Sequence, residues 1–319
     1  EFCNMKLAIL DDYLSVALKV ANWSAIEQHA KISVFTEHLG DEDHTAQALA
    51  DFDIVIVMRE RTRFPASLLT RLPKLRLLVT TGLRNQAIAM KTARECGIDV
   101  CGTNLLGYPA FEHTWALILA LVKKIPLENN SMHEGGWQKG FAGGLRGKTL
   151  GILGLGKLGS QVAKVGQAFG METIAWSQNL TEARAEECGV AKVGKDELLS
   201  LSDVVTIHLV MSDRTRGLIG ARELDLMKSS AYLVNTSRAP IIDETALVDA
   251  LQRGIIRGAG IDVFSVEPLP ADHSLRRLDN AVLTGHTGYV TEENFRLGYR
   301  EAVEDVLAWI SGGTIRLLN

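Results

Sequence analysis

The stretch Thr149–Gly159, with the sequence TLGILGLGKLG, is the strongest indication of how this chain folds. It opens with the apolar run Thr149–Leu153, which is typical of a buried strand. It leads into Lys157–Phe169, a predicted helix that Gly170 closes in the manner of a C-cap. A glycine-rich turn between a strand and a helix is the context that a dinucleotide-binding fingerprint requires.

The glycines of this turn have the spacing G-x-G-x-x-G. Gly154 permits a tight turn, Gly156 lets the backbone approach a pyrophosphate, and Gly159 lets the helix lie close on the strand. The pyrophosphate would then face the N–H groups at the helix N-terminus. The stretch therefore predicts a nucleotide-binding βαβ unit.

Apolar runs alternate with helical patterns on both sides of this unit. The expected strands are Lys6–Leu10, Lys31–Phe35, Asp53–Met58, Leu75–Thr80 and Ile98–Gly102, and then Thr149–Leu153, Glu172–Trp176, Val204–Val210, Ala231–Asn235, Gly258–Val263 and Ala281–Thr284. The expected helices include Tyr13–Asn22, His44–Asp51, Pro65–Arg71, Gln86–Cys96, Phe111–Ile125 ended by Pro126, and Thr291–Ile310 with an apolar stripe of Leu297, Val303, Val306, Leu307 and Ile310. Such alternation predicts an α/β fold with two doubly wound parallel-sheet halves in tandem. The Gly-rich segment Glu134–Gly147 is the clearest loop.

Length and charge fit this reading. The chain has 319 residues, 46% of them hydrophobic and 23% charged, which predicts about two globular domains. The formal net charge of −4 gives no global attraction to nucleic acid or to an anionic membrane. The most apolar stretch, Thr114–Val122, is too short to span a bilayer, and no secretory signal opens the chain. Glu1–Asn4, before Met5, are interpreted as an expression remnant.

The four cysteines predict a reducing compartment. Cys3, Cys96, Cys101 and Cys188 form no C-x-x-C pair and have no histidine at metal-ligand spacing. We expect small buried thiols, a cytoplasmic location and no metal site.

Three polar residues follow strands of the second half. Arg238 comes after Ala231–Asn235, Glu267 after Gly258–Val263, and His286 after Ala281–Thr284. The carboxyl ends of parallel strands share one rim, where ligands of open α/β sheets bind. We therefore expect these side chains to converge beside the dinucleotide.

Such a trio suits the oxidation of a 2-hydroxy acid. His286 would take the hydroxyl proton, and Glu267 would orient its ring and favour the imidazolium. Arg238 offers a fixed fork of donors for a substrate carboxylate and carbonyl. The nicotinamide supplies the hydride chemistry.

The end of Glu172–Trp176 bears on the choice of cofactor. Ser177 and Gln178 stand where an NAD-specific site usually has an acid for the ribose 2′-hydroxyl. No acid repels a 2′-phosphate there, and no directly adjacent Arg recruits one. The prediction is NAD or NADP, with a slight preference for NADP.

Taken together, these motifs resemble the D-isomer-specific 2-hydroxyacid dehydrogenase family. The similar segments are Gly154–Gly159, Asn235–Arg238, Gly260–Phe264 followed by Glu267-Pro268, and Gly285–Gly288, and the similarity covers essentially Met5 to Asn319. The resemblance implies that Arg238, Glu267 and His286 are catalytic, that Asp262 contacts the nicotinamide amide, and that His208–Val210 and Thr215 line the adenine side. The full implied cofactor set is Gly154, Leu155, Gly156, Lys157, Leu158, Gly159, Ser177, Gln178, His208, Leu209, Val210, Thr215, Thr236, Ser237, Arg238, Asp262, His286 and Gly288.

The resemblance also implies an organisation. A flavodoxin-like substrate domain would comprise 1–104 plus 287–319, and a Rossmann cofactor domain 105–286, with the active site in the cleft. Family members are usually dimers through the long helix and loop near 109–147, so a homodimer is expected.

The substrate is left open between 3-phosphoglycerate and the glyoxylate/hydroxypyruvate class. Ala239 and Val210 stand where the family usually has glycine and proline. Arg84-Asn85 follows Gly82-Leu83 where many members carry Asp, so the substrate loop is of a subtype. A dinucleotide-sensing corepressor of the same fold is the alternative function. Glu267 disfavours a formate dehydrogenase, where Gln is usual, and the position of the glycine loop disfavours an L-specific enzyme.

Basic residues follow two strands of the first half. Arg59, Arg61 and Arg63 follow Asp53–Met58, and Arg84 follows Leu75–Thr80. The substrate residues expected here are Arg59, Thr81, Gly82, Leu83 and Arg84, with backbone amides holding the substrate carboxylate. Arg59 and Arg84 would add a site for a second anion such as a phosphate.

Overall fold

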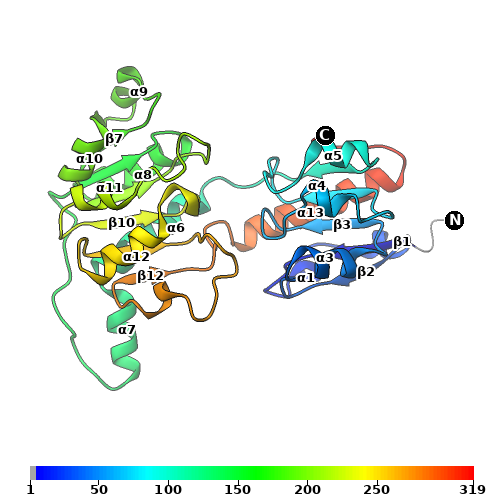
Figure 1. Ribbon diagram of the computed structural model, residues 1–319, viewed down its shortest axis with the longest axis horizontal. Helices are drawn as coiled ribbons and strands as arrows, with labels where there is room; N and C mark the ends of the chain where they lie inside the picture. The colour runs from blue at the N-terminus through cyan, green and yellow to red at the C-terminus, as the bar shows by residue number, and fades with distance from the viewer. Residues whose placement is uncertain (1–4) are drawn as a thin grey trace. The chain divides into compact units, whose positions relative to one another are not determined.

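The computed structural model describes residues 5–319. The chain divides into two compact units. Unit 1 is Glu1–Leu106 with Val290–Asn319, and unit 2 is Gly107–Tyr289. Each unit is built on its own sheet of parallel strands (Figure 1).

Unit 1 has a five-stranded parallel sheet. Its strands are β1 (Met5–Ile9), β2 (Ala30–Val34), β3 (Ile54–Val57), β4 (Leu77–Thr80) and β5 (Asp99–Gly102), and its helices are α1 (Ala17–Val20), α2 (Ser24–Glu27), α3 (Glu42–Leu49), α4 (Ala66–Leu69), α5 (Met90–Glu95) and α13 (Glu292–Ile310). The strand order is β2-β1-β3-β4-β5, which is the flavodoxin-like order. Helices α3, α4 and α5 bury one face of this sheet, while α13 packs against β4, α1 and α2.

Unit 2 has a seven-stranded parallel sheet. Its strands are β6 (Thr149–Leu153), β7 (Glu172–Trp176), β8 (Ala191–Lys192), β9 (Val204–Ile207), β10 (Tyr232–Asn235), β11 (Gly258–Ile261) and β12 (Ala281–Leu283). Its helices are α6 (Pro109–Val122), α7 (Ile125–His133), α8 (Lys157–Ala168), α9 (Glu182–Glu187), α10 (Lys195–Leu201), α11 (Ala221–Leu226) and α12 (Glu244–Gln252), with short 3-10 turns η1 (Ala239–Ile241) and η2 (Ser274–Arg277). The order β12-β11-β10-β9-β6-β7-β8 reverses direction at β6, as in a Rossmann fold.

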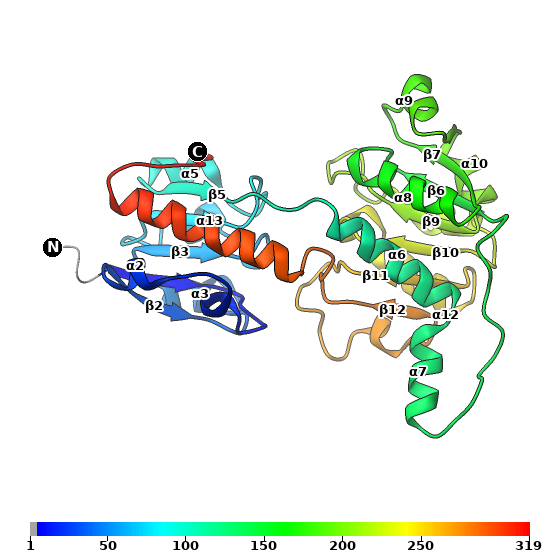
Figure 2. The same cartoon turned by 180° about the vertical axis from the view of Figure 1, so that it is seen from behind.

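Helices cover both faces of this second sheet. Leu117 of α6 and Val162 of α8 belong to a core cluster with Ile152 of β6, and Figure 2 shows these two helices on the same face. Leu198 of α10 and Leu247 of α12 belong to the cluster of the opposite face. The predicted α/β class with two doubly wound parallel sheets is confirmed.

Several element boundaries differ from those predicted. Helix α6 ends at Val122, and Pro126 lies in the first turn of a second helix, α7, instead of closing one long helix. Proline is tolerated there because the first-turn N–H groups have no intrahelical partner. Strand β8 was not predicted, since its two residues are exposed and show no apolar run.

The Tyr13–Asn22 pattern yields only the short helix α1. The Asp12 carboxylate accepts the N–H groups of Val16 and Ala17 and starts the helix there, after Ser15 at φ 55°. The helix has only four residues and ends at Val20.

The buried face of α13 differs from the predicted stripe. Only Val303 and Val306 of that stripe are buried, and the rest of the face is Asn294, Phe295, Gly298, Tyr299, Glu301, Ala302 and Asp305. Three of these residues are polar, which an apolar periodicity does not reveal.

The cysteines also differ in part. Cys96, Cys101 and Cys188 are free thiols, but only Cys101 is buried, because Cys96 ends α5 at the surface. Cys3 lies outside the described residues. Within residues 5–319, no helix is long and apolar enough to cross a membrane.

Candidate active site

The glycine loop after β6 has the geometry that its sequence predicts. Gly154 has φ 102°, and a Cβ there would lie 2.7 Å from the His208 carbonyl oxygen. A Cβ on Gly159 would collide with the Gly154 carbonyl oxygen. Both positions therefore require glycine for the protein's own packing.

Gly156 differs, because it faces open space. A Cβ built on it would meet no atom of the described chain within 4 Å. It is the N-cap of α8, where within residues 5–319 no side chain caps the first N–H groups. Open space in front of uncapped N–H groups can accept a pyrophosphate, so the glycine loop fits a dinucleotide.

The residues expected at the adenine side make hydrogen bonds within unit 2. The Ser237 hydroxyl donates to the Leu209 carbonyl at 2.5 Å, and Thr215 donates to the Val210 carbonyl at 2.9 Å. His208 Nε2 lies 2.9 Å from the Thr206 hydroxyl. Burial lowers the pKa of His208 to about 4, so its ring is neutral at physiological pH.

A basic group from helix α9 lies beside the glycine loop, and sequence reasoning missed it. Ser177 is half-buried and Gln178 is exposed. From helix α9, the Arg184 Nε donates to the Leu155 carbonyl of the glycine loop at 3.3 Å, while Nη1 donates to Glu187 at 2.7 Å. Arg184 comes seven residues after Ser177 in the sequence. It reaches the glycine loop only because of how helix α9 packs.

His286 and Glu267 meet as predicted from their strand ends. His286 Nδ1 lies 2.8 Å from Glu267 Oε2, and Glu267 Oε1 accepts the N–H of Phe264 at 2.9 Å. Both side chains are partly exposed, at 19% and 26%. His286 has φ 54°, a conformation that few residues other than glycine adopt.

Arg238 follows the neighbouring strand, β10. Its Nη1 donates to the Ser237 carbonyl at 2.8 Å. Buried Asn235 shapes this segment, because its amide donates to the Arg238 carbonyl and its oxygen accepts the Ser237 N–H. The three candidate catalytic residues thus follow β10, β11 and β12, which are neighbours in the sheet.

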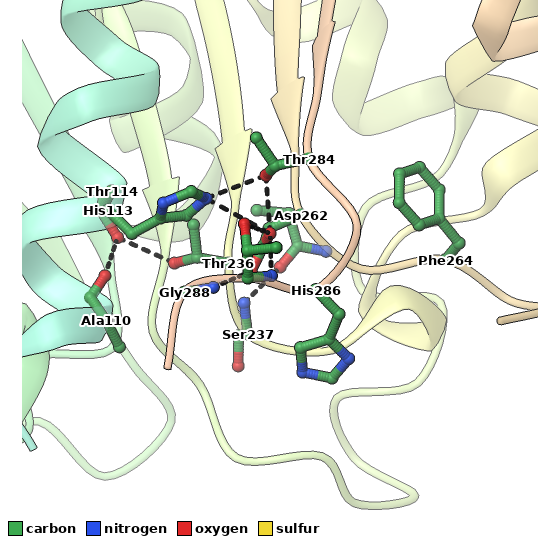
Figure 3. A network of polar contacts seen from close by, with 12 residues as sticks. Ala110, His113, Thr114, Thr236, Ser237, Asp262, Phe264, Thr284, His286 and Gly288 are labelled. Carbon is green, nitrogen blue, oxygen red and sulfur yellow. Dashed lines mark hydrogen bonds and ion pairs between the residues drawn. The ribbon is translucent and has the colours of Figure 1, made fainter. Parts of the chain in front are cut away.

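Asp262 lies behind the His286 turn and is 1% exposed (Figure 3). Its Oδ1 accepts from Thr284 Oγ1 at 2.6 Å and from the Thr287 N–H at 2.8 Å, and its Oδ2 accepts the Gly288 N–H at 3.0 Å. His113 of α6 adds a contact from Nε2 to Oδ1 at 3.2 Å. Contact of Asp262 with a nicotinamide amide stays a prediction.

Sequence reasoning missed His113 and Thr284. His113 lies in the second turn of α6, an apolar helix that packs on the sheet, and a polar residue at such a position was the available signal. Thr236 is tied to the same helix, since its hydroxyl lies 2.8 Å from that of Thr114.

The predicted substrate residues lie in unit 1, after β3 and β4. Arg59 has φ 53°; its N–H donates to Thr81 Oγ1 at 3.0 Å, and its carbonyl accepts from Asn85 at 2.7 Å. Its guanidinium lies against Gly82, where a Cβ would overlap Nη1.

The other residues near these two strand ends differ in exposure and contacts. Leu83, Arg84 and Arg63 are exposed. Arg61 donates to the Asp11 carbonyl at 2.7 Å and stacks over Tyr13.

The family comparison matches unit 2. Residues 115–288 match the model described as D-isomer specific 2-hydroxyacid dehydrogenase, NAD binding domain. A glyoxylate reductase of Aeropyrum pernix is 38% identical over 260 residues, which is 78% of each chain. A D-3-phosphoglycerate dehydrogenase of Archaeoglobus fulgidus is 34% identical over 91% of this chain, which spans only 54% of that relative.

Solved structures agree over the whole chain. A structure described as a putative D-3-phosphoglycerate dehydrogenase from Ralstonia solanacearum has a TM-score of 0.92 at 34% identity, covering 99% of this chain and 97% of that one. A D-lactate dehydrogenase from Aquifex aeolicus, complexed with NAD and lactic acid, has a TM-score of 0.77 at 27% identity, covering 96% of each chain. These relatives are named as dehydrogenases or reductases, which does not support the corepressor alternative. The chain belongs to the D-isomer specific 2-hydroxyacid dehydrogenase family, and unit 2 contains its NAD-binding domain.

Proposed function

We propose that the protein transfers a hydride between NAD(P) and a small D-2-hydroxy acid, with Arg238, Glu267 and His286 as its catalytic residues. The observation that carries this proposal is the 2.8 Å pair of His286 Nδ1 and Glu267 Oε2 at the rim of the NAD-binding sheet. A carboxylate accepts only, so this pair puts a proton on Nδ1 and leaves Nε2 for the substrate.

His286 moves the proton of the reaction in this scheme. During oxidation its Nε2 accepts the hydroxyl proton, and Glu267 stabilises the resulting imidazolium. During reduction the same atom returns the proton to the carbonyl oxygen. A bound nicotinamide supplies the hydride chemistry. Arg238 would bind the substrate carboxylate and carbonyl through its planar donors.

The cofactor proposal is NAD or NADP, with a slight preference for NADP. Ser177 puts no carboxylate at the end of β7 to repel a 2′-phosphate. Arg184 adds a positive charge beside the glycine loop through its bond to the Leu155 carbonyl. Both features favour the phosphorylated ribose.

The substrate proposal is a 2-oxo acid that carries a second anionic group, such as a phosphate. Arg59 is held in a left-handed conformation at the end of β3 with its guanidinium against Gly82. Strained residues kept by their surroundings concentrate at functional sites. Arg84 is exposed on the segment after β4, and backbone amides of residues 81–83 would hold the common carboxylate.

A substrate panel tests this function. Phosphohydroxypyruvate, hydroxypyruvate, glyoxylate and pyruvate are compared with NADH and NADPH, and the phosphorylated substrate should have the highest kcat/KM. Arg59→Ala should then lower kcat/KM for phosphohydroxypyruvate by about 10–100-fold, the scale of losing a hydrogen bond to a charged group.

The control is Arg63→Ala, an exposed neighbour on the same segment. Equal losses for phosphorylated and unphosphorylated substrates would show that Arg59 holds the loop or the common carboxylate. In that case the glyoxylate/hydroxypyruvate class becomes the substrate proposal. No turnover of any 2-oxo acid would contradict the function itself.

We also infer a homodimer and a cytoplasmic location. Large apolar side chains are exposed on α7 and the loop after it, among them Ile125, Trp137 and Phe141. Several exposed large apolar side chains on one segment are typical of an interaction site. The free thiols of Cys96, Cys101 and Cys188 are consistent with a reducing compartment.

A further inference from the structure

The turn that carries His286 is attached to one buried carboxylate. Asp262 accepts the Thr284 hydroxyl before His286 and the N–H groups of Thr287 and Gly288 after it. Residues on both sides of His286 are therefore fixed to the same side chain. Movement of Asp262 would move the backbone that orients the His286 ring.

His113 is a further partner of this carboxylate, and it comes from a different element, helix α6. Its Nε2 lies 2.9 Å from Thr284 Oγ1 and 3.2 Å from Asp262 Oδ1. Burial raises the pKa of Asp262, but the hydrogen bonds from His113 and Thr284, together with the charge of His113 and the Thr287 N–H, hold that pKa below its usual value.

The ionised carboxylate of Asp262 determines which ring nitrogen of His113 carries a proton. An ionised Asp accepts only, and Thr284 gives its single proton to Asp262 at 2.6 Å. Nε2 of His113 must therefore carry a proton and donate it to both oxygens. In Figure 3 the His113 ring faces Asp262 and Thr284, whereas the His286 ring points away from them.

We propose that His113 is a positioning residue for His286. It donates from Nε2 to Thr284 and Asp262, and so holds residues 284–288 in the conformation that presents His286 to Glu267 and to the substrate. The catalytic part of this inference rests on the proposed function, while the structural part does not. A misplacement of reacting groups by about 1 Å can cost 10²-fold in rate, so the expected effect is large.

Two substitutions of His113 separate hydrogen bonding from packing. His113→Leu removes the donor, and His113→Gln restores an N–H donor at similar reach. The control is His44→Leu, which breaks an exposed His–Asp pair of unit 1 (2.7 Å to Asp41). Hydrogen exchange of the 284–289 segment, the thermal midpoint, kcat and the Kd for the cofactor are measured for each variant.

We expect His113→Leu to speed exchange of the Thr287 and Gly288 amides by at least 10-fold and to lower kcat by about 10–100-fold. The cofactor Kd should change by less than about 3-fold. His113→Gln should recover most of both losses, and His44→Leu should change neither. Thr284→Val should give a similar loss, and the double variant should lose no more than the worse single variant, because both act on one network.

Three outcomes overturn the inference: normal exchange and kcat in His113→Leu, a Gln variant as impaired as the Leu variant, or additive losses in the double variant. A wild-type protein that reduces no 2-oxo acid would overturn the proposed function instead. The exchange measurement would still decide whether His113 holds the turn.

Discussion

Two residues predicted to act at the candidate site have a strained backbone conformation. His286 and Arg59 both have φ near 54°, and each lies within three residues of a strand end of its own sheet. A non-glycine residue in this region costs free energy and persists only where its surroundings hold it. At His286 the Asp262 network provides that support, which is consistent with a side chain whose orientation matters for function.

His286→Ala tests the proton-transfer role. We expect kcat to fall by about 10²–10⁴-fold, the usual contribution of general acid–base catalysis, because no other group would occupy the position on Glu267. The cofactor Kd should change little, since the glycine loop is untouched. Steady-state kinetics in both directions and cofactor fluorescence titration measure this. A variant with wild-type kcat would remove His286 from the mechanism.

Ser177→Asp and Arg184→Ala test the cofactor preference. The wild type should use NADPH at least as well as NADH. The added carboxylate should shift the kcat/KM ratio towards NADH by at least 10-fold, because it repels the 2′-phosphate. Arg184→Ala should weaken binding of 2′,5′-ADP but not of 5′-AMP. A hundredfold preference of the wild type for NADH would contradict this reading of Ser177.

The sequence identified some candidate site residues and missed others for a physical reason. Glu267 comes six residues after the end of β11, and His286 comes three residues after the end of β12. The parallel-sheet rule therefore predicts that they lie at one rim, and the structure places His286 Nδ1 2.8 Å from Glu267 Oε2. His113 and Arg184 project from helices, and their partners depend on how each helix packs on the sheet. Neither contact is visible in local sequence spacing.

Helix α13 shows what an apolar sequence periodicity cannot predict. Glu301 accepts the Asn104 N–H at 2.6 Å, and Asn294 accepts the Leu106 N–H at 2.7 Å. These polar side chains are buried because they satisfy the backbone that follows β5. An apolar pattern locates the helix but cannot identify a buried polar face, so the predicted helix was right and its predicted stripe was largely wrong.

Asp305 on this face predicts a pH-dependent stability. It is fully buried; burial, opposed by Arg316 and assisted by Glu301 and Glu304, raises its pKa from 3.8 to about 7. Since the folded state binds this proton more tightly than the unfolded state, stability falls as pH rises from about 4 to about 7. Between pH 5.5 and 8 the loss is about 2 kcal/mol.

Asp305→Asn should remove this part of the pH dependence. The amide resembles the neutral acid and can still accept the Arg316 Nε–H, which lies 3.0 Å from Oδ1. Thermal unfolding midpoints of both proteins at pH 5.5 and pH 8 measure the effect, and the wild type should lose more stability than the variant. Parallel slopes would show that Asp305 is ionised throughout this range.

The C-terminal residues of the chain pair with the sheet of unit 1. The Arg316 carbonyl accepts the Gly102 N–H at 3.1 Å, and the Leu318 N–H donates to the Val100 carbonyl at 2.7 Å. Residues 290–319 therefore complete unit 1, both as α13 and as an added edge beside β5. The alternating pattern predicted two sheets, but it did not predict this closing contact. Residues 315–319 are too few to show the periodicity of a strand.

The assembly is tested on the segment 125–147, which comprises α7 and the following loop. Figure 1 shows it projecting from the sheet of unit 2, and Trp137 and Phe141 on it are 74% and 95% exposed. Exposure of aromatic side chains on a projecting segment is costly in water, and burial against a second copy would remove that cost.

Trp137→Ser with Phe141→Ser should weaken the proposed homodimer by at least 10-fold, because large aromatic side chains dominate the binding energy of such interfaces. Sedimentation velocity over a concentration series measures the dissociation constant. The control is Leu14→Ser with Leu18→Ser, which removes apolar side chains of unit 1 that are 56% and 50% exposed and should leave the dimer intact. A wild type that sediments as a monomer at micromolar concentration would contradict the dimer, and equal weakening by both pairs would locate the interface elsewhere.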